Sequence, residues 1–470
     1  MTQFSEQEFQ EPLTEERCRQ WLVSRVFRFR PADYSQKYPK WPGMVGLEIE
    51  MLPFALGRKE VIPLNGASGS HGILREAAEP GWTPEFVDGD SSKGLLRIKL
   101  DENDQITFEP GGQIEFSSKP YPCLSDALDR MSLIQNKLEN IFSPHGVYLA
   151  QSGIHPWQSP DSIGLQMKKA RYQAMNEFFS NLGEFGPRMM RQTCTVQVNL
   201  DFGDSEGTLA KRFLVSHLIA PLATAMFANS PFCDGKDTGF SSYRARVWQG
   251  LAHSRTGFPK LEQVAAHMTL ESCVTSYLDF LLDARVVFIE GANHKVMDGS
   301  LTLRDWIGNP VDGISPTLKD FETHLSLHFP EVRPRGFLEL RSVDCMPRYF
   351  QELPAIFYAS LLYDEKALDA SLELMLPNLG KLTELLKKSA YGLKDDLLFD
   401  LTYKIGKLVL EGFERLPPCF QGKGSLDKLN TYMELFLSRR KTPADYLRPL
   451  LQGGGGLEVF RKLDDQWQSN

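Results

Sequence analysis

The chain has 470 residues, of which 42% are hydrophobic and 24% charged, and its formal net charge at pH 7 is -8. A chain of this length can bury a large core, and its acidic balance argues against nucleic acid as the main partner, because phosphate backbones attract basic patches. No apolar run approaches the roughly 20 residues that a membrane-spanning helix needs, so we expect no membrane partner.

The first residues and the cysteines suggest a compartment. The N-terminal stretch MTQFSEQEFQEPLTEE is acidic and has neither an apolar signal core nor the composition of a transit peptide. The seven cysteines are odd in number, widely scattered and without a CxxC motif, which is typical of a reducing compartment. We therefore expect a cytoplasmic location, and the cysteine spacing gives no reason to infer a disulfide.

The first predicted elements are a helix and a strand. Apolar residues fall at helical spacing from Glu15 to Arg30, which predicts a helix packed beside a sheet. The stretch VGLEIEM, Val45 to Met51, then alternates apolar residues with Glu48 and Glu50. Because successive side chains of a strand point to opposite faces, this alternation places both carboxylates on one face.

The same pattern returns in QITFEPGGQIEF, Gln105 to Phe116, where Glu109 and Glu115 flank a Pro-Gly-Gly bend. A half-buried strand with a solvated face would also show this alternation. A helix capped by Ser125 and running to Phe142 is predicted next, with its apolar positions in one stripe.

A third polar strand face is predicted in RQTCTVQVNLDF, Arg191 to Phe202. Cys194 lies on its apolar side, and the opposite face carries Thr195, Gln197, Asn199 and Asp201. Leu209 to Asn229 then reads as an apolar helix interrupted at Pro221. His324 and His328 share a helical face, but they lack the HExxH pattern of a zinc pair and lie among leucines, so packing is the favoured interpretation.

The last predicted strand is FLELR, Phe337 to Arg341, in which Glu339 and Arg341 share a face. Beyond Tyr349 the apolar spacing becomes helical, and Thr442-Pro443 is typical of a helix start. If the polar faces form one wall, five carboxylates meet there: Glu48, Glu50, Glu109, Glu115 and Glu339. Unpaired carboxylates are costly to bury, and Mg²⁺, which prefers such oxygens and is commonly shared with nucleotide phosphates, would neutralise them.

Several of these segments resemble plant-type glutamate-cysteine ligase. They are, in chain order, GLEIE, ITFEPGGQIEFSS, RQTCTVQVNLDF, APLATAMFANSPF, SSYRARVW, RTG, FPEVRPRGFLELRSVD and LPAIFYASLLYD. The resemblance runs from about Trp41 to Asp364, and its long motifs are specific, whereas GxExE alone would be weak. It implies an α+β fold related to glutamine synthetase, a curved antiparallel β-sheet surrounded by helices. We therefore expect one catalytic unit over 1–470, with a sheet-bearing core at 41–364 and a helical part at 365–470.

The resemblance also implies an activity and roles for residues. It implies that L-glutamate and L-cysteine are joined into γ-glutamylcysteine through a γ-glutamyl phosphate, with cleavage of ATP to ADP and phosphate and with two or three bound Mg²⁺ ions. We assign the metal to Glu48, Glu50, Glu109, Glu115 and Glu339, catalysis to Glu50 and Arg341, and the nucleotide to Arg341. Substrate binding is assigned to Gln197, Asn199, Arg244 and the pair Arg171-Tyr172.

Alternatives remain open at this point. The segment from Gln249 to Arg255 departs from the acidic pattern of the family, so a related ligase with another amine substrate is one alternative. A phosphagen-type kinase is a second, because a related sheet can hold Mg-ATP. A catalytically inactive metal-binding scaffold is a third, although its expected loss of site carboxylates is not seen.

Overall fold

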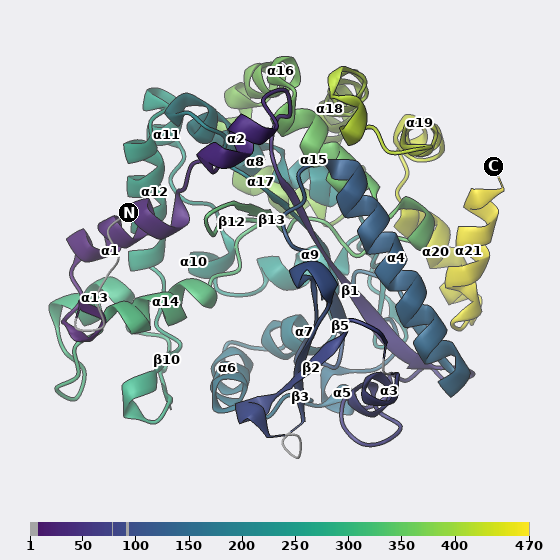
Figure 1. The fold of residues 1–470 in the computed structure, drawn as a ribbon, viewed down its shortest axis with the longest axis horizontal. Coiled ribbons are helices and arrows are strands. Elements are labelled where there is room, and N and C mark those ends of the chain that lie inside the picture. Colours follow the sequence, from purple (N-terminus) through teal and green to yellow (C-terminus); the bar gives the residue numbers. More distant parts are fainter. Residues whose placement is uncertain (1–7, 78, 91–93, 470) are drawn as a thin grey trace.

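A curved antiparallel sheet organises the computed structural model, which describes residues 8–77, 79–90 and 94–469 (Figure 1). Within these residues its strand order is β12 (Val332–Pro334), β13 (Leu338–Leu340), β7 (Val196–Leu200), β1 (Val45–Ala55), β5 (Ile114–Ser117), β4 (Gln105–Phe108), β3 (Leu95–Lys99) and β2 (Thr83–Phe86), and β6 (Val147–Ala150) pairs with β1. Every pairing in this sheet is antiparallel. The predicted α+β fold with an antiparallel sheet is therefore confirmed.

Strand β1 is the centre of the sheet because its two halves pair with different neighbours. Its first half lies between β7 and β5, and its second half, from Leu52, pairs with β6. The register sets Glu50 opposite Glu115 and Glu48 opposite Gln197, while Glu339 of β13 lies opposite Asn199 of β7. The polar positions of four strands are thus neighbours in space.

Helix α4 (Leu124–Phe142) packs on the other side of these strands, with contacts to β1, β5 and β6. Its buried apolar positions include Leu128, Met131, Ile134 and Leu138, the predicted stripe. The predicted cap is wrong, because the N-cap position is Cys123, and the Ser125 hydroxyl instead donates to the Cys419 carbonyl oxygen at 2.7 Å.

Helix α8 (Glu206–Met226) runs unbroken through Pro221, so the predicted interruption is also wrong. Proline removes one backbone N–H from the helix, but nearly every residue of α8 beyond Leu209 is buried. Packing against α15 (Leu353–Tyr363), α16 (Glu365–Met375), α17 (Leu382–Ser389) and α18 (Asp396–Arg415) therefore outweighs the lost hydrogen bond.

The remaining helices surround this layer. On the N-terminal side they are α1 (Glu15–Trp21), continued by a π-turn at Leu22–Val26, α2 (Ala32–Lys37), α3 (Ser70–Glu76), α5 (Pro160–Ile163), α6 (Ala170–Asn181) and α7 (Phe185–Arg191). The middle of the chain adds α9 (Tyr243–Gln249), α10 (His253–Thr256), α11 (Glu262–His267), α12 (Leu270–Leu282), α13 (Leu303–Gly308) and α14 (Leu318–Ser326). Two short hairpins, β8 (Phe232–Cys233) with β9 (Lys236–Asp237) and β10 (Phe288–Ile289) with β11 (Lys295–Val296), lie outside the main sheet.

The C-terminal part is helical and closes with α19 (Ser425–Leu435), α20 (Pro443–Gln452) and α21 (Glu458–Gln468). Thr442 and Asp445 form a capping box at the start of α20, so the helix start predicted at Thr442-Pro443 is confirmed. One hydrophobic core extends from Leu13 to Trp467 and joins this part to the sheet. Among the described helices, none has the length and apolar character required to cross a bilayer.

Candidate active site

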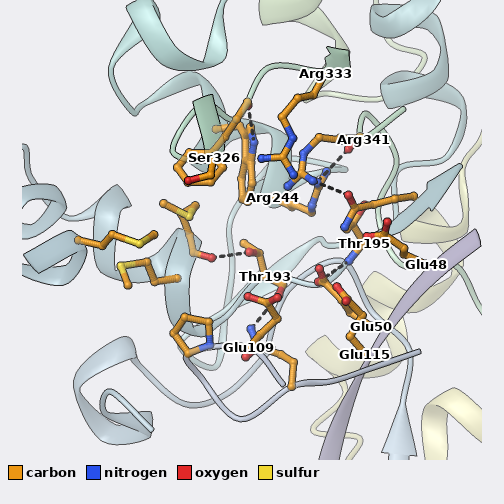
Figure 2. Close-up of a pocket in the computed structure, with 18 of the residues that line it drawn as sticks. Glu48, Glu50, Glu109, Glu115, Thr193, Thr195, Arg244, Ser326, Arg333 and Arg341 are labelled. Carbon is orange, nitrogen blue, oxygen red and sulfur yellow. Dashed lines mark hydrogen bonds between the residues drawn. The ribbon is translucent and has the colours of Figure 1, made fainter. Parts of the chain in front are cut away.

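Three carboxylates meet on one face of the sheet. Glu50 of β1 and Glu115 of β5 are opposite each other, and Glu109 follows β4 in the turn of the β4–β5 hairpin. Each of the three offers an oxygen, and these oxygens all lie within 4.8 Å of one another. Figure 2 shows them with Glu48 on the same side of the pocket. Carboxylate oxygens this close are the donor set of a hard divalent cation.

The Pro-Gly-Gly bend places Glu109. The Glu109 N–H donates to the Gln113 carbonyl at 3.0 Å, and the Gly112 N–H donates to the Glu109 carbonyl at 2.8 Å. Gly112 has a φ of +88°, and a Cβ on Gly111 would lie 2.1 Å from the Arg191 carbonyl oxygen. Glycine is therefore required at both positions, once for backbone conformation and once for a close backbone approach.

Polar neighbours hold Glu48, Glu50 and Glu115 by one oxygen each. Glu50 accepts from the Thr195 N–H at 2.9 Å, and Glu48 accepts from the Asn199 amide at 2.9 Å. Glu115 accepts from the hydroxyls of Thr107 and Ser117, both at 2.7 Å, through the same Oε1. These bonds orient the side chains without using all of their acceptor capacity.

Burial and mutual repulsion favour the protonated forms of Glu48, Glu50 and Glu109. Burial, with the charge of Glu115 second, raises the pKa of Glu48 to about 7 and that of Glu50 to about 8. The pKa of Glu109 is raised well above its usual value for the same two reasons. A divalent cation would supply the missing positive charge and displace these protons, so the donor set fits Mg²⁺ in chemistry as well as in spacing.

Arginines line the opposite half of the pocket. Figure 2 shows Arg244, Arg333 and Arg341 across the pocket from the carboxylates. Glu339 belongs to this half, because it accepts from Arg333 at 3.0 Å, Arg335 at 2.9 Å and Arg341 at 3.2 Å. Burial alone would raise the pKa of Glu339, but Arg333 and Arg341 outweigh it and hold the pKa well below its usual range. The structure thus does not bring Glu339 into the acidic cluster.

Arg341 lies at the boundary between the two halves. Its guanidinium donates to the Gln197 side-chain oxygen and to Glu339, and its carbonyl oxygen accepts from Arg244 at 2.9 Å. The Arg244 guanidinium in turn stacks on the Trp248 ring, 4.6 Å from the ring centroid. Gln197 therefore orients Arg341, and Trp248 orients Arg244.

Asp344 fixes the helix that carries Arg244. It is 1% exposed, and its carboxylate accepts from the Asn229 N–H at 2.7 Å and from the hydroxyls of Ser230 and Ser242 at 2.7 and 2.8 Å. Ser242 is the N-cap of α9, so the buried carboxylate ties the start of this helix to the strand end after β13.

The cavity between the two halves has a volume of about 280 Å³. Nine of the predicted residues line it: Glu48, Glu50, Glu109, Glu115, Arg171, Tyr172, Gln197, Arg244 and Arg341. Asn199 does not, since it lies beside Glu48 and lines a second cavity of about 200 Å³. Glu339 is fully buried behind the arginines.

Sequence reasoning missed several residues of this cavity. Arg333 and Arg335 lie in or next to β12 and could have been found by alternation, because they alternate with the buried Val332 and Pro334. In the structure both pair with Glu339. The apolar lining includes Met175, Met190 and Trp248. These residues have no recognisable pattern in the sequence, because they reach the site only when their helices pack beside the sheet.

Comparison with known proteins assigns the chain that carries this site to a protein family. The family model described as "Glutamate-cysteine ligase family 2(GCS2)" matches residues 44–402, which hold all the carboxylates and arginines discussed above. The chain belongs to glutamate-cysteine ligase family 2. Among its relatives is the chloroplastic glutamate-cysteine ligase of Medicago truncatula, 32% identical over 437 residues, 91% of this chain and 81% of that protein. That of Nicotiana tabacum is 30% identical over 459 residues, 96% of this chain and 82% of that protein.

Solved structures support the fold of this family member. A glutamate-cysteine ligase from Francisella tularensis, in complex with AMP, has a TM-score of 0.51 at 14% identity, covering 94% of this chain and 90% of that one. A bifunctional glutathione synthetase from Pasteurella multocida has a TM-score of 0.51 at 12% identity and covers 93% of this chain, which spans about half (53%) of that protein.

The same relatives contradict the expected cytoplasmic location. The plant glutamate-cysteine ligases that match this chain are named as chloroplastic. The prediction of a cytoplasmic enzyme is therefore wrong. It rested on the composition of the first residues and on the cysteine pattern, and reducing conditions with scattered free thiols are not specific to one compartment.

Proposed function

We propose that this protein joins the γ-carboxylate of L-glutamate to the amine of L-cysteine, with conversion of ATP to ADP and phosphate. The observation that carries this proposal is a single cavity with a cluster of carboxylates on one side and a set of arginines on the other. A reaction between a carboxylate, a polyphosphate and an amino acid needs both, because the carboxylate and phosphate groups of these ligands are anionic. The arginines and a cation held by the carboxylate cluster would neutralise and orient them.

The acidic cluster would hold Mg²⁺. Glu50, Glu109 and Glu115 supply the donor set for one ion, and Glu48, which adjoins them, supplies a carboxylate for a second beside the nucleotide phosphates. We infer two or three ions in all, as the family resemblance implied. When bound, Mg²⁺ would neutralise negative charge on the phosphoryl group while it is transferred. Glu339 is assigned instead to anchoring the arginines, which is a departure from the role expected for it.

The second cavity is the proposed place of the nucleoside part of ATP. It lies beyond Glu48 and Asn199 at the start of β1, and its lining includes Met44, Phe29 and Phe337. Apolar and aromatic lining with a few polar groups is typical of a site for a flat base. Asn199 lines this cavity and donates to Glu48, which lines the main cavity, so a nucleotide bound there would have its phosphates near Glu48.

The chain's own residues then have defined tasks. Arg244 binds the α-carboxylate of glutamate, and its stacking on Trp248 keeps the guanidinium in place. The γ-carboxylate attacks the γ-phosphorus of ATP, ADP leaves, and Arg341 and Arg333 stabilise the charge on the transferred group. The amine of cysteine then attacks the carbonyl carbon of γ-glutamyl phosphate, and inorganic phosphate leaves as the amide forms. Glu50 contributes as one of the three carboxylates that would hold the cation.

Two other functions are tested by the same assay. ADP release would be measured with glutamate alone, with glutamate plus cysteine, and with glutamate plus amines that lack an α-carboxylate, and the products would be identified by mass. We expect release that depends on both amino acids and a product with the mass of γ-glutamylcysteine. Phosphorylation of an amine without amide formation would favour the kinase alternative, and preference for putrescine would favour the other ligase.

A further inference from the structure

Arg255 is a buried cation that the proposed mechanism does not use. It belongs to the short helix α10, is 0% exposed and does not line the main cavity. Its guanidinium donates to the backbone carbonyls of Leu327, at 2.5 Å, and of Arg285. No carboxylate among the described residues offsets its charge, so burial lowers its pKa to about 9. A buried guanidinium without an anionic partner is costly, and an apolar side chain would fill the same space without that cost.

The guanidinium is placed where it fixes the segment after α14, residues 327–329. The Arg255 side chain donates to the Leu327 carbonyl, and the Arg255 carbonyl accepts from the Phe329 N–H at 3.1 Å. The segment is therefore held at both ends by one residue. The bond to the Arg285 carbonyl ties the same guanidinium to the chain that follows α12.

The segment after α14 also holds two arginines of the main cavity. The His328 carbonyl accepts from Arg333 at 3.0 Å, and the Phe329 carbonyl accepts from the Trp248 indole N–H at 3.2 Å. Trp248 is the ring on which Arg244 stacks. Figure 2 shows Arg244 and Arg333 on the same side of the pocket. Carbonyl oxygens of one short segment thus place Arg333 directly and Arg244 through Trp248.

The direction of a backbone carbonyl is set by its rigid peptide plane, so a three-residue segment fixed at both ends presents its carbonyls in one arrangement. Groups that bind a substrate depend on such supporting hydrogen bonds for their precise geometry. We propose that Arg255 is a positioning residue, which acts through the segment after α14 and sets the arrangement of Arg244 and Arg333 for the reaction. This inference rests on the proposed function, in which Arg244 binds the glutamate α-carboxylate and Arg333 stabilises the transferred phosphoryl group.

A purely structural role for Arg255 would have different consequences. Loss of a fold-supporting side chain lowers stability without favouring one substrate over another. Loss of a positioning residue raises the KM for glutamate through Arg244 and lowers kcat through Arg333. The KM for ATP should stay nearly constant, because no residue of the segment lines the second cavity, where the nucleoside is placed.

The test measures kcat, the KM values for glutamate and ATP, and Tm. Arg255→Met keeps an unbranched side chain and removes both guanidinium bonds, so the KM for glutamate should rise about tenfold and kcat should fall about fivefold, with the KM for ATP within twofold. Arg255→Lys keeps the charge and one donor group and should raise the KM for glutamate about threefold. Arg440→Met is the matched control, because Arg440 also donates to two backbone carbonyls, those of Leu393 and Lys394, outside the cavity. It should leave both KM values unchanged.

A double-mutant comparison follows the connection to Arg244. Trp248→Phe keeps an aromatic ring beside Arg244 and removes the bond to the Phe329 carbonyl. If Arg255 acts through this bond, the two changes are not additive. Arg255→Met should then raise the KM for glutamate less than threefold in the Trp248→Phe background, against about tenfold in the wild type.

Each outcome supports or overturns the inference. An unchanged KM for glutamate in folded Arg255→Met, or in Arg255→Lys where the first variant does not fold, overturns it. Equal increases in the KM for glutamate and for ATP, or a full tenfold effect in the Trp248→Phe background, also contradict it. Failure of both Arg255 variants to fold while Arg440→Met folds would make Arg255 a residue of the fold alone. Absence of glutamate-dependent ADP release in the wild type would instead refute the proposed function.

Discussion

Glu50 and Glu115 lie directly opposite each other on adjacent antiparallel strands, both less than 10% exposed, with carboxylate oxygens within 4.8 Å of each other. Like charges in such a cross-strand pair destabilise a sheet. The pair is stable here because burial keeps the pKa of Glu50 high enough for it to hold a proton near neutral pH. This arrangement sacrifices stability for a site that a divalent cation can complete, and it is the basis of the first two predictions.

Glu115→Gln should lower kcat/KM by about a hundredfold or more while leaving the fold intact, because it keeps the shape of a cation ligand and removes its charge. Glu85→Gln is the matched control on strand β2, where the carboxylate is outside the cluster and pairs with Arg97 and Lys99. Steady-state kinetics at saturating Mg²⁺, with circular dichroism for folding, would check this. Near-normal turnover of Glu115→Gln would remove the carboxylate cluster from the mechanism.

The stability of the metal-free protein should fall as pH rises from about 6.5 to 8.5. The raised pKa values of Glu48, about 7, and Glu50, about 8, mean that the folded state holds protons that the unfolded state has lost above pH 4.5. Their stabilising contribution is therefore lost progressively from about pH 4.5 to about pH 8, and the last part of this loss falls in the range above pH 6.5. Buried neutral histidines such as His155, whose pKa burial lowers to about 3, destabilise only below about pH 6.5 and do not mask the effect.

Thermal unfolding in EDTA and in Mg²⁺, measured across this range, tests the pH prediction. The stabilisation by Mg²⁺ should grow with pH, because the cation competes with protons for the same oxygens. In Glu50→Gln the decline of Tm in EDTA should be shallower. A Tm in EDTA that is flat from pH 6.5 to 8.5 would show that the cluster does not hold protons.

Arg341→Lys should reduce kcat by about tenfold or more. The guanidinium bonds Gln197 and Glu339 at once, and an ammonium on a flexible stem cannot present the same planar fork to them and to a phosphoryl group. Arg304→Lys, in a surface cluster with Glu15, Asp279 and Asp283, is the control for the same chemical change. Initial rates over a range of ATP concentrations would separate kcat from KM. Unchanged values for both would show that Arg341 does not meet the nucleotide.

Gly111→Ala should damage both stability and catalysis, because its Cβ would lie 2.1 to 2.7 Å from backbone atoms of Arg191. Neither backbone segment can move easily to relieve this clash. We expect a loss of about 1–3 kcal/mol in the free energy of unfolding, together with displacement of Glu109. Gly207→Ala is the opposite case, since nothing lies within 4 Å of its Cβ in the first turn of α8. It should be neutral or stabilise the protein by up to about 1 kcal/mol. Denaturant unfolding of both variants, with activity, checks the contrast.

Alternation of polar and apolar residues predicted the strands and the shared face of Glu48 and Glu50, because the period of a strand fixes which side chains are neighbours. It could not predict which strands are adjacent. Glu339 satisfies the same rule, yet the β12–β13 hairpin sets Arg333 opposite it and makes it an arginine partner. Asn199 is two residues from Gln197 on the same face, but the two side chains reach different cavities.

Other parts of the molecule depend on packing that local patterns do not encode. Pro221 reads as a break, and only the burial of α8 on all sides explains why the helix continues. Ser125 has the chemistry of an N-cap, but the chain turns into α4 two residues earlier. The apolar lining of the main cavity, which includes Met175 of α6 and Met190 of α7, forms only when these two helices dock beside the sheet, so no single segment of the sequence predicts it.

Asp344→Asn should raise the KM for glutamate while leaving the KM for ATP nearly unchanged. The carboxylate accepts three hydrogen bonds, from Asn229, Ser230 and Ser242, and an amide can accept only through its one oxygen and brings a donor where donors already converge. The N-cap of α9 should then shift and carry Arg244 away from the glutamate α-carboxylate, with a loss of about tenfold in kcat/KM. Asp344→Glu keeps the charge but needs more room beside Gly153, whose Cβ position is 2.4 Å from the carboxylate carbon, so it should not restore activity. Ser242→Ala removes only one of the three donors and should show a smaller effect in the same direction. Equal increases of KM for glutamate and ATP would mean that Asp344 supports the whole sheet rather than the helix of Arg244.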